Sequence, residues 1–588
     1  MLRRVFFLIP LLSPVLSTAS EKPWREVRSP HFRLVTNGST RDTIKVAQEF
    51  EQMRWVFATR FPNIRLDSGA PLLVFAARDG DTAKELDPWT WKRMGEHVAG
   101  AFYHGWEKEY AMVRLDTFGG EGSKEVVYHE YTHSVLHLNS HWLPLWLNEG
   151  LAEFYGFTRF EEHRIYLGAP TERHGALRDT TPMHVQTLTS LNGLPFDQEA
   201  FYAQSWALVH YLTYGQGMEN GSKLGQFFAL LQQGKPQDRA FEEVFGDFKA
   251  IDKGFAAYLR QPTYATTILR DPPQIDEKSI SYRPLSVAET EAELAGFHLW
   301  TRNREAARAL LEGALKDDPK LGLAHEDMAF LDFAEGKDSE ARSEFAQAYA
   351  LDNKLYLSQF AKTLMSPFAV SNKVQDMNAF GAEIGRVLEV NPQFAPAYVQ
   401  LARLAYREGD FQAALLMSLK AEELQPSLAG YHLLSGQILL RIGKGTEAGD
   451  AARFVADRWV GADHNEAIEL WNRVPSAERS GGALSGVAPK DTEAVEGRVE
   501  KIFCSEKDQE FSFVLDQVGR SLTFHRKSGF SVGFSDTIWY GGDHFNYCHH
   551  IEGLRAIVHY QKPTDATYAG DIAELELRDD LPEPLTKP

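Results

Sequence analysis

Residues 123–155 constrain the fold of this chain more than any other stretch, and they read SKEVVYHEYTHSVLHLNSHWLPLWLNEGLAEFY. Apolar residues recur at helical spacing around an H-E-x-x-H pattern; Ser123 suits the N-cap of a helix and Glu125 its first turn. Residues four apart share one face of a helix, so His129 and His133 can place two imidazole nitrogens about 2 Å from one zinc ion. Glu130 follows directly and is suited to take a proton from an attacking water.

A second helical pattern follows and carries two carboxylates four residues apart. Residues 146–154 read WLNEGLAEF, which places Glu149 and Glu153 one turn from each other. A catalytic zinc usually has three protein ligands and one open position. An acid that returns on an adjacent helix would therefore complete the ligand set.

These two helices resemble a helix pair of the gluzincin metallopeptidases, which include thermolysin-like and M1 aminopeptidase-like enzymes. In that group the Glu of an Asn-Glu pair on the second helix is the third zinc ligand. The resemblance implies one Zn2+ ion held by His129, His133 and Glu149, with Glu130 as the general base and Glu153 orienting an imidazole. Fifteen residues separate His133 from Glu149, fewer than in well-known members, so Glu153 remains an alternative ligand.

Comparison with two other metallopeptidase patterns limits the class of peptidase that the sequence predicts. The metzincin pattern is excluded, because Leu136 and Asn139 stand where it requires Gly and His. M1 aminopeptidases carry a G-x-M-E-N run whose Glu binds the free amine of the substrate, and residues 100–103 contain no Glu. Whether the chain would be an endo- or an aminopeptidase therefore stays open. The helical stretch 201–212 looks like the M1-like helix that supplies an oxyanion-stabilising tyrosine; this match implies Tyr202, for which a core aromatic is the alternative.

The amino-terminal part predicts an exported chain with a strand-rich lobe before the zinc helix. Residues 1–19 have the basic start, apolar run and small-residue end of a secretory signal peptide, so we expect an extracytoplasmic protein, periplasmic or secreted. Residues 20–275 then form the expected metallopeptidase-like domain. Its predicted elements are strands at 31–36, 71–76 and 110–115, a helix at 43–61, a turn at 100–105 and a linker at 271–284.

An internal repeat of 34 residues occupies residues 285–475 and is similar to tetratricopeptide repeats. Pro392 and Pro426 lie one period apart, and small residues recur at the two positions where paired helices pack closest. We expect helix pairs with one divergent pair at 355–391, and a protein partner bound through the repeats. The small positions hold Ala307, Ala341, Ala414 and Ala448 in the first set and Ala314, Ala348 and Ala421 in the second.

The pattern of residues 493–580 predicts a small all-β domain, either a barrel or an OB-like fold. Strands are expected at 495–503, 510–514, 521–524, 537–540 and 554–560. Both cysteines of the chain, Cys504 and Cys548, lie here, and outside the cytoplasm we expect them to form a disulfide. A second metal site at 544–550 is the alternative use of Cys548.

The fold class expected from the whole sequence is therefore multidomain α+β, with a gluzincin-like domain, an all-α solenoid and a small β domain. The formal net charge of −19 argues against nucleic acid or an anionic membrane surface as a main partner, and no mature apolar run is long enough to span a bilayer. The function expected is zinc-dependent hydrolysis of a peptide or protein substrate. One alternative is a non-catalytic secreted tetratricopeptide scaffold with a zinc- or peptide-binding domain. Another is zinc-dependent hydrolysis of a non-peptide substrate, such as an epoxide or a cell-wall amide, at the same site.

Overall fold

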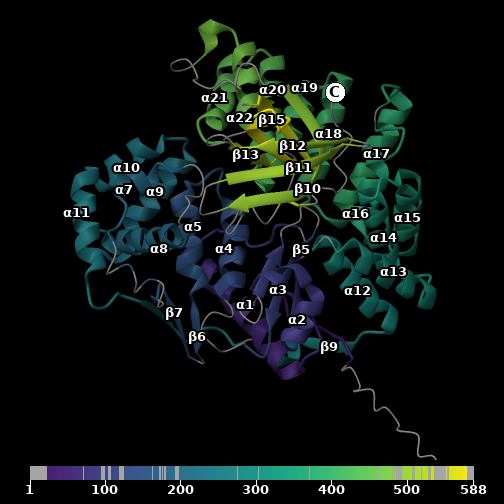
Figure 1. The fold of residues 1–588 in the computed structure, drawn as a ribbon, viewed down its shortest axis with the longest axis horizontal. Helices are drawn as coiled ribbons and strands as arrows, with labels where there is room; N and C mark the ends of the chain where they lie inside the picture. The colour runs from purple at the N-terminus through teal and green to yellow at the C-terminus, as the bar shows by residue number, and fades with distance from the viewer. Residues whose placement is uncertain are drawn as a thin grey trace, which may run out of the picture.

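Figure 1 shows the computed structural model of the chain. It describes residues 23–578 apart from 70–71, 95–99, 104–107, 118–124, 162, 171–173, 175–176, 178–180, 192–197, 275, 302, 370, 460–461, 480, 482–483, 485–492, 506–509, 518–519, 527–530, 535–550, 553–554 and 564. The predicted signal peptide, Ser123, the strand predicted at 537–540 and Cys548 with its alternative metal site lie outside the described residues. In the described part of the chain, every helix is either too short or too polar to span a bilayer.

The amino-terminal domain, called the metal domain below after the zinc site that the sequence predicts in it, is built on a six-stranded sheet in the order β4-β5-β3-β2-β1-β9. Strands β2, β3 and β5 run parallel, and β4 pairs antiparallel with β5 at the edge. Residues on both faces of β3 are buried, as is typical of strands covered by helices on both sides. The strands are β1 (Arg25–Arg28), β2 (Arg33–Thr36), β3 (Leu72–Ala77), β4 (Gly100–Tyr103), β5 (Glu109–Arg114) and β9 (Ser281–Pro284).

Helices of the metal domain cover this sheet and form a second lobe beside it. Helix α1 begins after Ser39, whose side chain accepts a hydrogen bond from the amide of Asp42. A three-stranded sheet of β6 (Arg159–Glu161), β7 (Arg164–Leu167) and β8 (Thr267–Arg270) lies in the second lobe. The helices are α1 (Thr40–Arg60), α2 (Gly80–Leu86), α3 (Pro88–Met94), α4 (Glu125–Asn139), α5 (Leu145–Gly156), α7 (Val185–Thr189), α8 (Gln198–Tyr214), α9 (Ser222–Gln232), α10 (Gln237–Phe245) and α11 (Phe248–Leu259).

Two local predictions are wrong in this domain. The predicted turn at 100–105 begins instead with strand β4, because the β-forming residues of Gly100–Tyr103 pair along β5. The predicted linker at 271–284 ends in strand β9, which pairs with β1 and so adds the last strand to the sheet. The chain therefore enters the repeats directly from the metal domain.

Helices α12 to α21 form the predicted antiparallel pairs, and α22 follows the last pair. The alanines predicted at the close-packing positions are all fully buried, as the 34-residue period requires. In the divergent pair, Phe380 and Val387 occupy those positions and are buried as well. The helices are α12 (Val287–Trp300), α13 (Arg304–Asp317), α14 (Gly322–Ala334), α15 (Asp338–Leu351), α16 (Tyr356–Leu364), α17 (Val374–Val390), α18 (Ala395–Glu408), α19 (Phe411–Leu424), α20 (Ala429–Arg441), α21 (Gly445–Ala456) and α22 (Ala462–Arg473).

The carboxyl-terminal domain is a small β barrel, as predicted. Its described strands are joined in the order β12-β11-β10-β14-β15, and a parallel pairing of β12 with β15 closes the ring. Strand β13 continues along β15 from the point where β12 leaves it. This order is that of an OB-like Greek-key barrel. The strands are β10 (Glu493–Ser505), β11 (Glu510–Gln517), β12 (Arg520–His525), β13 (Ser531–Phe534), β14 (Arg555–Gln561) and β15 (Gly570–Arg578).

Candidate metal centre

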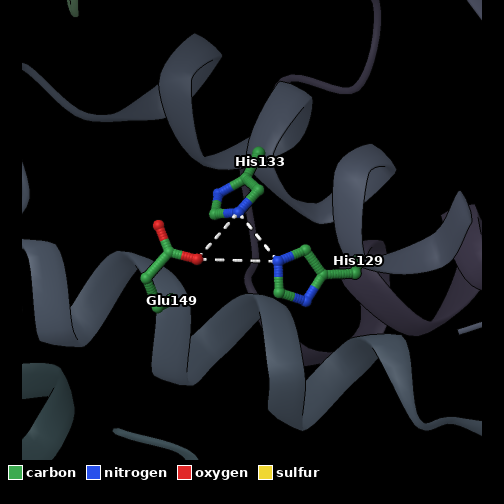
Figure 2. Close-up of side chains that lie close together, drawn as sticks. All are labelled: His129, His133 and Glu149. Atoms are coloured by element: carbon green, nitrogen blue, oxygen red, sulfur yellow. Dashed lines mark hydrogen bonds and ion pairs between the residues drawn. The ribbon is translucent and has the colours of Figure 1, made fainter. Parts of the chain in front are cut away.

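Helices α4 and α5 bring two histidines and one glutamate together in the interior of the metal domain (Figure 2). The Nε2 atoms of His129 and His133 are 3.1 Å apart. The Oε2 atom of Glu149 lies 3.6 Å from Nε2 of His129 and 3.4 Å from Nε2 of His133. The three side chains thus point their donor atoms at one another from two neighbouring helices.

The donor triangle has the size that a zinc ion requires. A tetrahedral zinc with bonds of about 2.0–2.1 Å separates its ligand atoms by about 3.3–3.4 Å. The three distances of 3.1, 3.4 and 3.6 Å scatter around this value, so points about 2 Å from all three atoms exist beside their plane. Two imidazoles and one carboxylate also match the donor set of catalytic zinc sites.

The carboxylate of Glu153 takes a different position from that of Glu149. Its Oε1 atom lies 3.5 Å from Nδ1 of His129, which is the ring nitrogen that faces away from the triangle. Its other oxygen lies 3.5 Å from Nε2 of His174. Glu153 is therefore placed to orient the ring of His129, and Glu149 is the acid that faces both histidines.

His174 is a residue of this site that the sequence did not reveal. Its ring is fully buried and stacks on Trp206 of α8, with ring centroids 3.8 Å apart and an interplanar angle of 7°. The edge of the same ring meets Phe157. No helical or strand spacing in the sequence relates His174 to His129, His133 or Glu149, so sequence reasoning could not place it in this site.

Two glycines of α5 allow the close approach that places Glu149. A Cβ atom added at Gly150 would lie 2.5 Å from the carbonyl oxygen of Ser205 on α8. One added at Gly156 would lie 3.0 Å from Cβ of His129 on α4. Helix α5 therefore touches α8 and α4 through backbone, and a side chain at either position would separate the helices.

The two predicted catalytic residues lie on the helices of the site. Glu130 is buried on α4, directly after His129. Tyr202 is buried on α8, and its ring meets the ring of His129 at 82° with centroids 6.4 Å apart. The structure thus brings Tyr202 next to a residue of the donor triangle.

His210, eight residues after Tyr202, is a packed core residue. Its Nε2 atom faces the carbonyl oxygens of Gly168 and Ala265 at 3.0 and 2.9 Å, and its Nδ1 atom lies 2.7 Å from the hydroxyl of Tyr258. Burial lowers the pKa of His210 to about 4, against the opposing effect of the two carbonyl contacts. The neutral ring therefore donates from Nε2 and accepts from the tyrosine.

The cysteine prediction concerns the carboxyl-terminal barrel rather than the metal domain. Cys504, near the end of β10, is disulfide-bonded. Its predicted partner Cys548 is the other cysteine of the chain and lies outside the described residues.

No protein-family model matches this chain, and none of the curated proteins does. Solved structures of tetratricopeptide repeat proteins are similar to part of it. PilF of Pseudomonas aeruginosa is 16% identical over 32% of this chain and 83% of its own, with a TM-score of 0.28. YrrB, a repeat protein with an unusual peptide-binding site, is 18% identical over 32% and 92%, with a TM-score of 0.26. PilW, a type IV pilus biogenesis factor, is 20% identical over 30% and 97%, with a TM-score of 0.25.

Proposed function

We propose that this protein is a zinc-dependent peptide hydrolase of the gluzincin type. The observation that carries the proposal is the donor triangle of His129, His133 and Glu149, whose dimensions and chemistry suit one zinc ion. The buried acids Glu149 and Glu153 add to this argument, because buried carboxylates are costly unless a cation compensates their charge.

Each residue around the triangle has a role in this proposal. A bound zinc supplies Lewis acidity, which lowers the pKa of water and polarises a carbonyl group. Glu130 accepts the proton of the attacking water and passes it to the leaving amine. Glu153 holds the ring of His129 through Nδ1 and so fixes which nitrogen faces the metal. Tyr202 donates a hydrogen bond to the developing oxyanion.

The sheet next to α4 offers a place for an extended peptide. Strand β4 is at the edge of the sheet and contacts α4, the helix that carries both histidines. Within the described part of the sheet, β4 pairs with a strand on one side only, which is the arrangement in which an extended peptide can add as a further strand. A peptide or protein is therefore the substrate class that we propose.

Glu130→Gln separates catalysis from metal binding. We expect the variant to bind zinc as the wild-type protein does, while hydrolysis of a fluorogenic casein falls by several orders of magnitude, because the amide cannot accept the proton. Glu242→Gln, which changes an exposed glutamate of α10, is the matched control and should keep full activity.

Two results of this experiment would contradict the proposal. Unchanged hydrolysis by Glu130→Gln would exclude the assigned base. Zinc binding by the wild-type protein without chelator-sensitive hydrolysis of casein would favour the alternative function, a secreted repeat scaffold whose metal domain binds zinc or peptide without turnover. We propose an extracytoplasmic location for either function, on the basis of the signal-like residues 1–19.

A further inference from the structure

The repeat domain lies against the metal domain along its length. Figure 1 shows its helices as an arc around the metal domain, from α12 on the right to α22 at the top. At the start of the arc, the ring of Phe297 on α12 packs 4.8 Å from that of Phe75 on β3. Next, the ammonium group of Lys108 pairs with Glu326 and Asp327 of α14, at 2.9 Å from each. These contacts come from the first helix of each pair.

The burial pattern of the helices agrees with this arrangement. Helix α14, a first helix, is buried almost continuously from Ala324 to Asp332, including its charged residues. Helix α13, a second helix, buries only the stripe formed by Ala307, Leu311 and Ala314. A first helix of this solenoid thus packs against its repeat neighbours on one side and against the metal domain on the other. The inner face, which repeat proteins commonly offer to a partner, is in contact with the protein's own metal domain.

Repeat helices later in the arc contact the carboxyl end of α4, the helix that carries both histidines. One guanidinium nitrogen of Arg65 donates both to the carbonyl of Leu138 on α4 and, at 2.8 Å, to the carbonyl of Leu424 on α19. The backbone N–H of Arg65 also donates to Oδ1 of Asn139 at 2.8 Å, and the side-chain amide nitrogen of Asn139 donates to the carbonyl of Arg65 at 2.7 Å. Arg65 therefore joins the end of α4 to the end of a repeat helix.

Residues 140–144, which connect α4 to α5, also contact the repeat domain. The ring of His141 lies 5.6 Å from that of His432 on α20. The guanidinium of Arg458, just after α21, lies over the ring of Trp142 at 5.7 Å and donates at 2.7 Å to the carbonyl of Gly234. On the metal-domain side, Gln232 bonds to the backbone of this connection at both His141 and Trp142.

This connection joins the helix of the two histidines to the helix of Glu149, so a shift of the connection would change the distance between the donor atoms. We propose that the inner face of the repeat domain is bound by this chain's own metal domain, and that α19 to α21 hold the α4–α5 connection where Glu149 can meet His129 and His133. The repeats are then a positioning part of the metal site. The proposal rests on the zinc site proposed above.

The test measures zinc affinity in the full-length protein. Metal-free wild-type protein and Arg458→Ala are titrated with Zn2+ in competition with a chromophoric chelator, and folding is followed by circular dichroism. We expect Arg458→Ala to bind zinc at least about tenfold more weakly, in the range found when residues that support metal ligands are removed. Glu293→Gln is the matched control, because it weakens the contact of α12 with Arg33 on β2 and leaves the α4–α5 connection intact. This control should bind zinc as the wild-type protein does.

A second variant keeps the test decisive if Arg458→Ala does not fold. Arg458→Lys retains the positive charge over Trp142 but has no guanidinium group to reach the carbonyls of Phe454 and Gly234 together. It should also bind zinc more weakly than the wild-type protein. Equal affinity in folded Arg458 variants and wild type would overturn the role of the repeats while leaving the zinc site in place. Absence of zinc binding by the wild-type protein would instead overturn the proposed function itself.

Discussion

Gly150→Ala tests whether the contact between α5 and α8 controls the metal site. The new Cβ atom would lie 2.5 Å from the carbonyl oxygen of Ser205 and 2.6 Å from Cγ2 of Val209, whereas ordinary contacts begin at 3.4 Å. The backbone of α5 must therefore move by about 0.9 Å, because the carbonyl belongs to a packed helix. Glu149 is the preceding residue and moves with it.

Gly150→Ala should lower both the stability of the protein and its zinc affinity. Overpacking of this kind typically lowers the free energy of unfolding by about 1–3 kcal/mol, of which the better helix propensity of alanine offsets about 1 kcal/mol. A shift of about 0.9 Å also exceeds the roughly 0.2 Å tolerance of zinc–ligand distances, so zinc affinity should fall by more than tenfold.

The assays are urea unfolding of the metal-free protein and zinc titration against a chelator. Gly225→Ala is the matched control: it makes the same substitution at an exposed position of helix α9, where an added Cβ meets nothing within 4 Å, and it should be neutral or stabilising. If Gly150→Ala bound zinc as tightly as Gly225→Ala, the reasoning that close packing of α5 places the third ligand would be refuted.

Three further predictions concern the surroundings of the site. Glu153→Gln should weaken zinc binding by about 10–100-fold in a chelator competition, and an unchanged affinity would show that the contact with Nδ1 of His129 has no role. Tyr202→Phe should lower the kcat for casein without changing zinc affinity. A kcat equal to that of the wild-type protein would show that Tyr202 only packs in the core. Because the pKa of His210 is lowered to about 4 in the folded protein, its contribution to stability is complete above about pH 6.5 and is lost as the pH falls towards 4, by about 3 kcal/mol. Urea unfolding of the metal-free protein should show this decrease in the free energy of unfolding, and the decrease should be smaller in His210→Gln. An equal decrease in both proteins would contradict the prediction.

The parts of the site that could be predicted from the sequence are those with a spacing along one helix. His129 and His133 share a face because they are four residues apart, whatever else the chain does. The choice between Glu149 and Glu153 could not be made in this way, because it depends on how α5 is rotated against α4. That rotation is fixed by the backbone contacts of Gly150 and Gly156, which no spacing reveals.

The fold was predictable to a similar extent. The repeats can be predicted because alanines recur where paired helices pack closest, and the barrel because several β-forming runs separated by turns follow one another in residues 493–580. The last strand of the barrel, β15, was missed, and β4 was interpreted as a turn. The contacts between the domains could not be predicted either, because residues such as Lys108 and Glu326 are typical of a solvated surface until the two surfaces meet.

The hydrogen bond from Arg65 to Leu424 spans 359 positions of the chain. A ribosome makes α4 and α5 long before it makes α19, and domains that emerge first begin to fold first. The ligand-bearing helices are therefore complete well before the segment that steadies the turn between them has been synthesised. Under the two proposals above, the metal site would therefore reach its final geometry only after the repeat helices that hold the α4–α5 connection have been made.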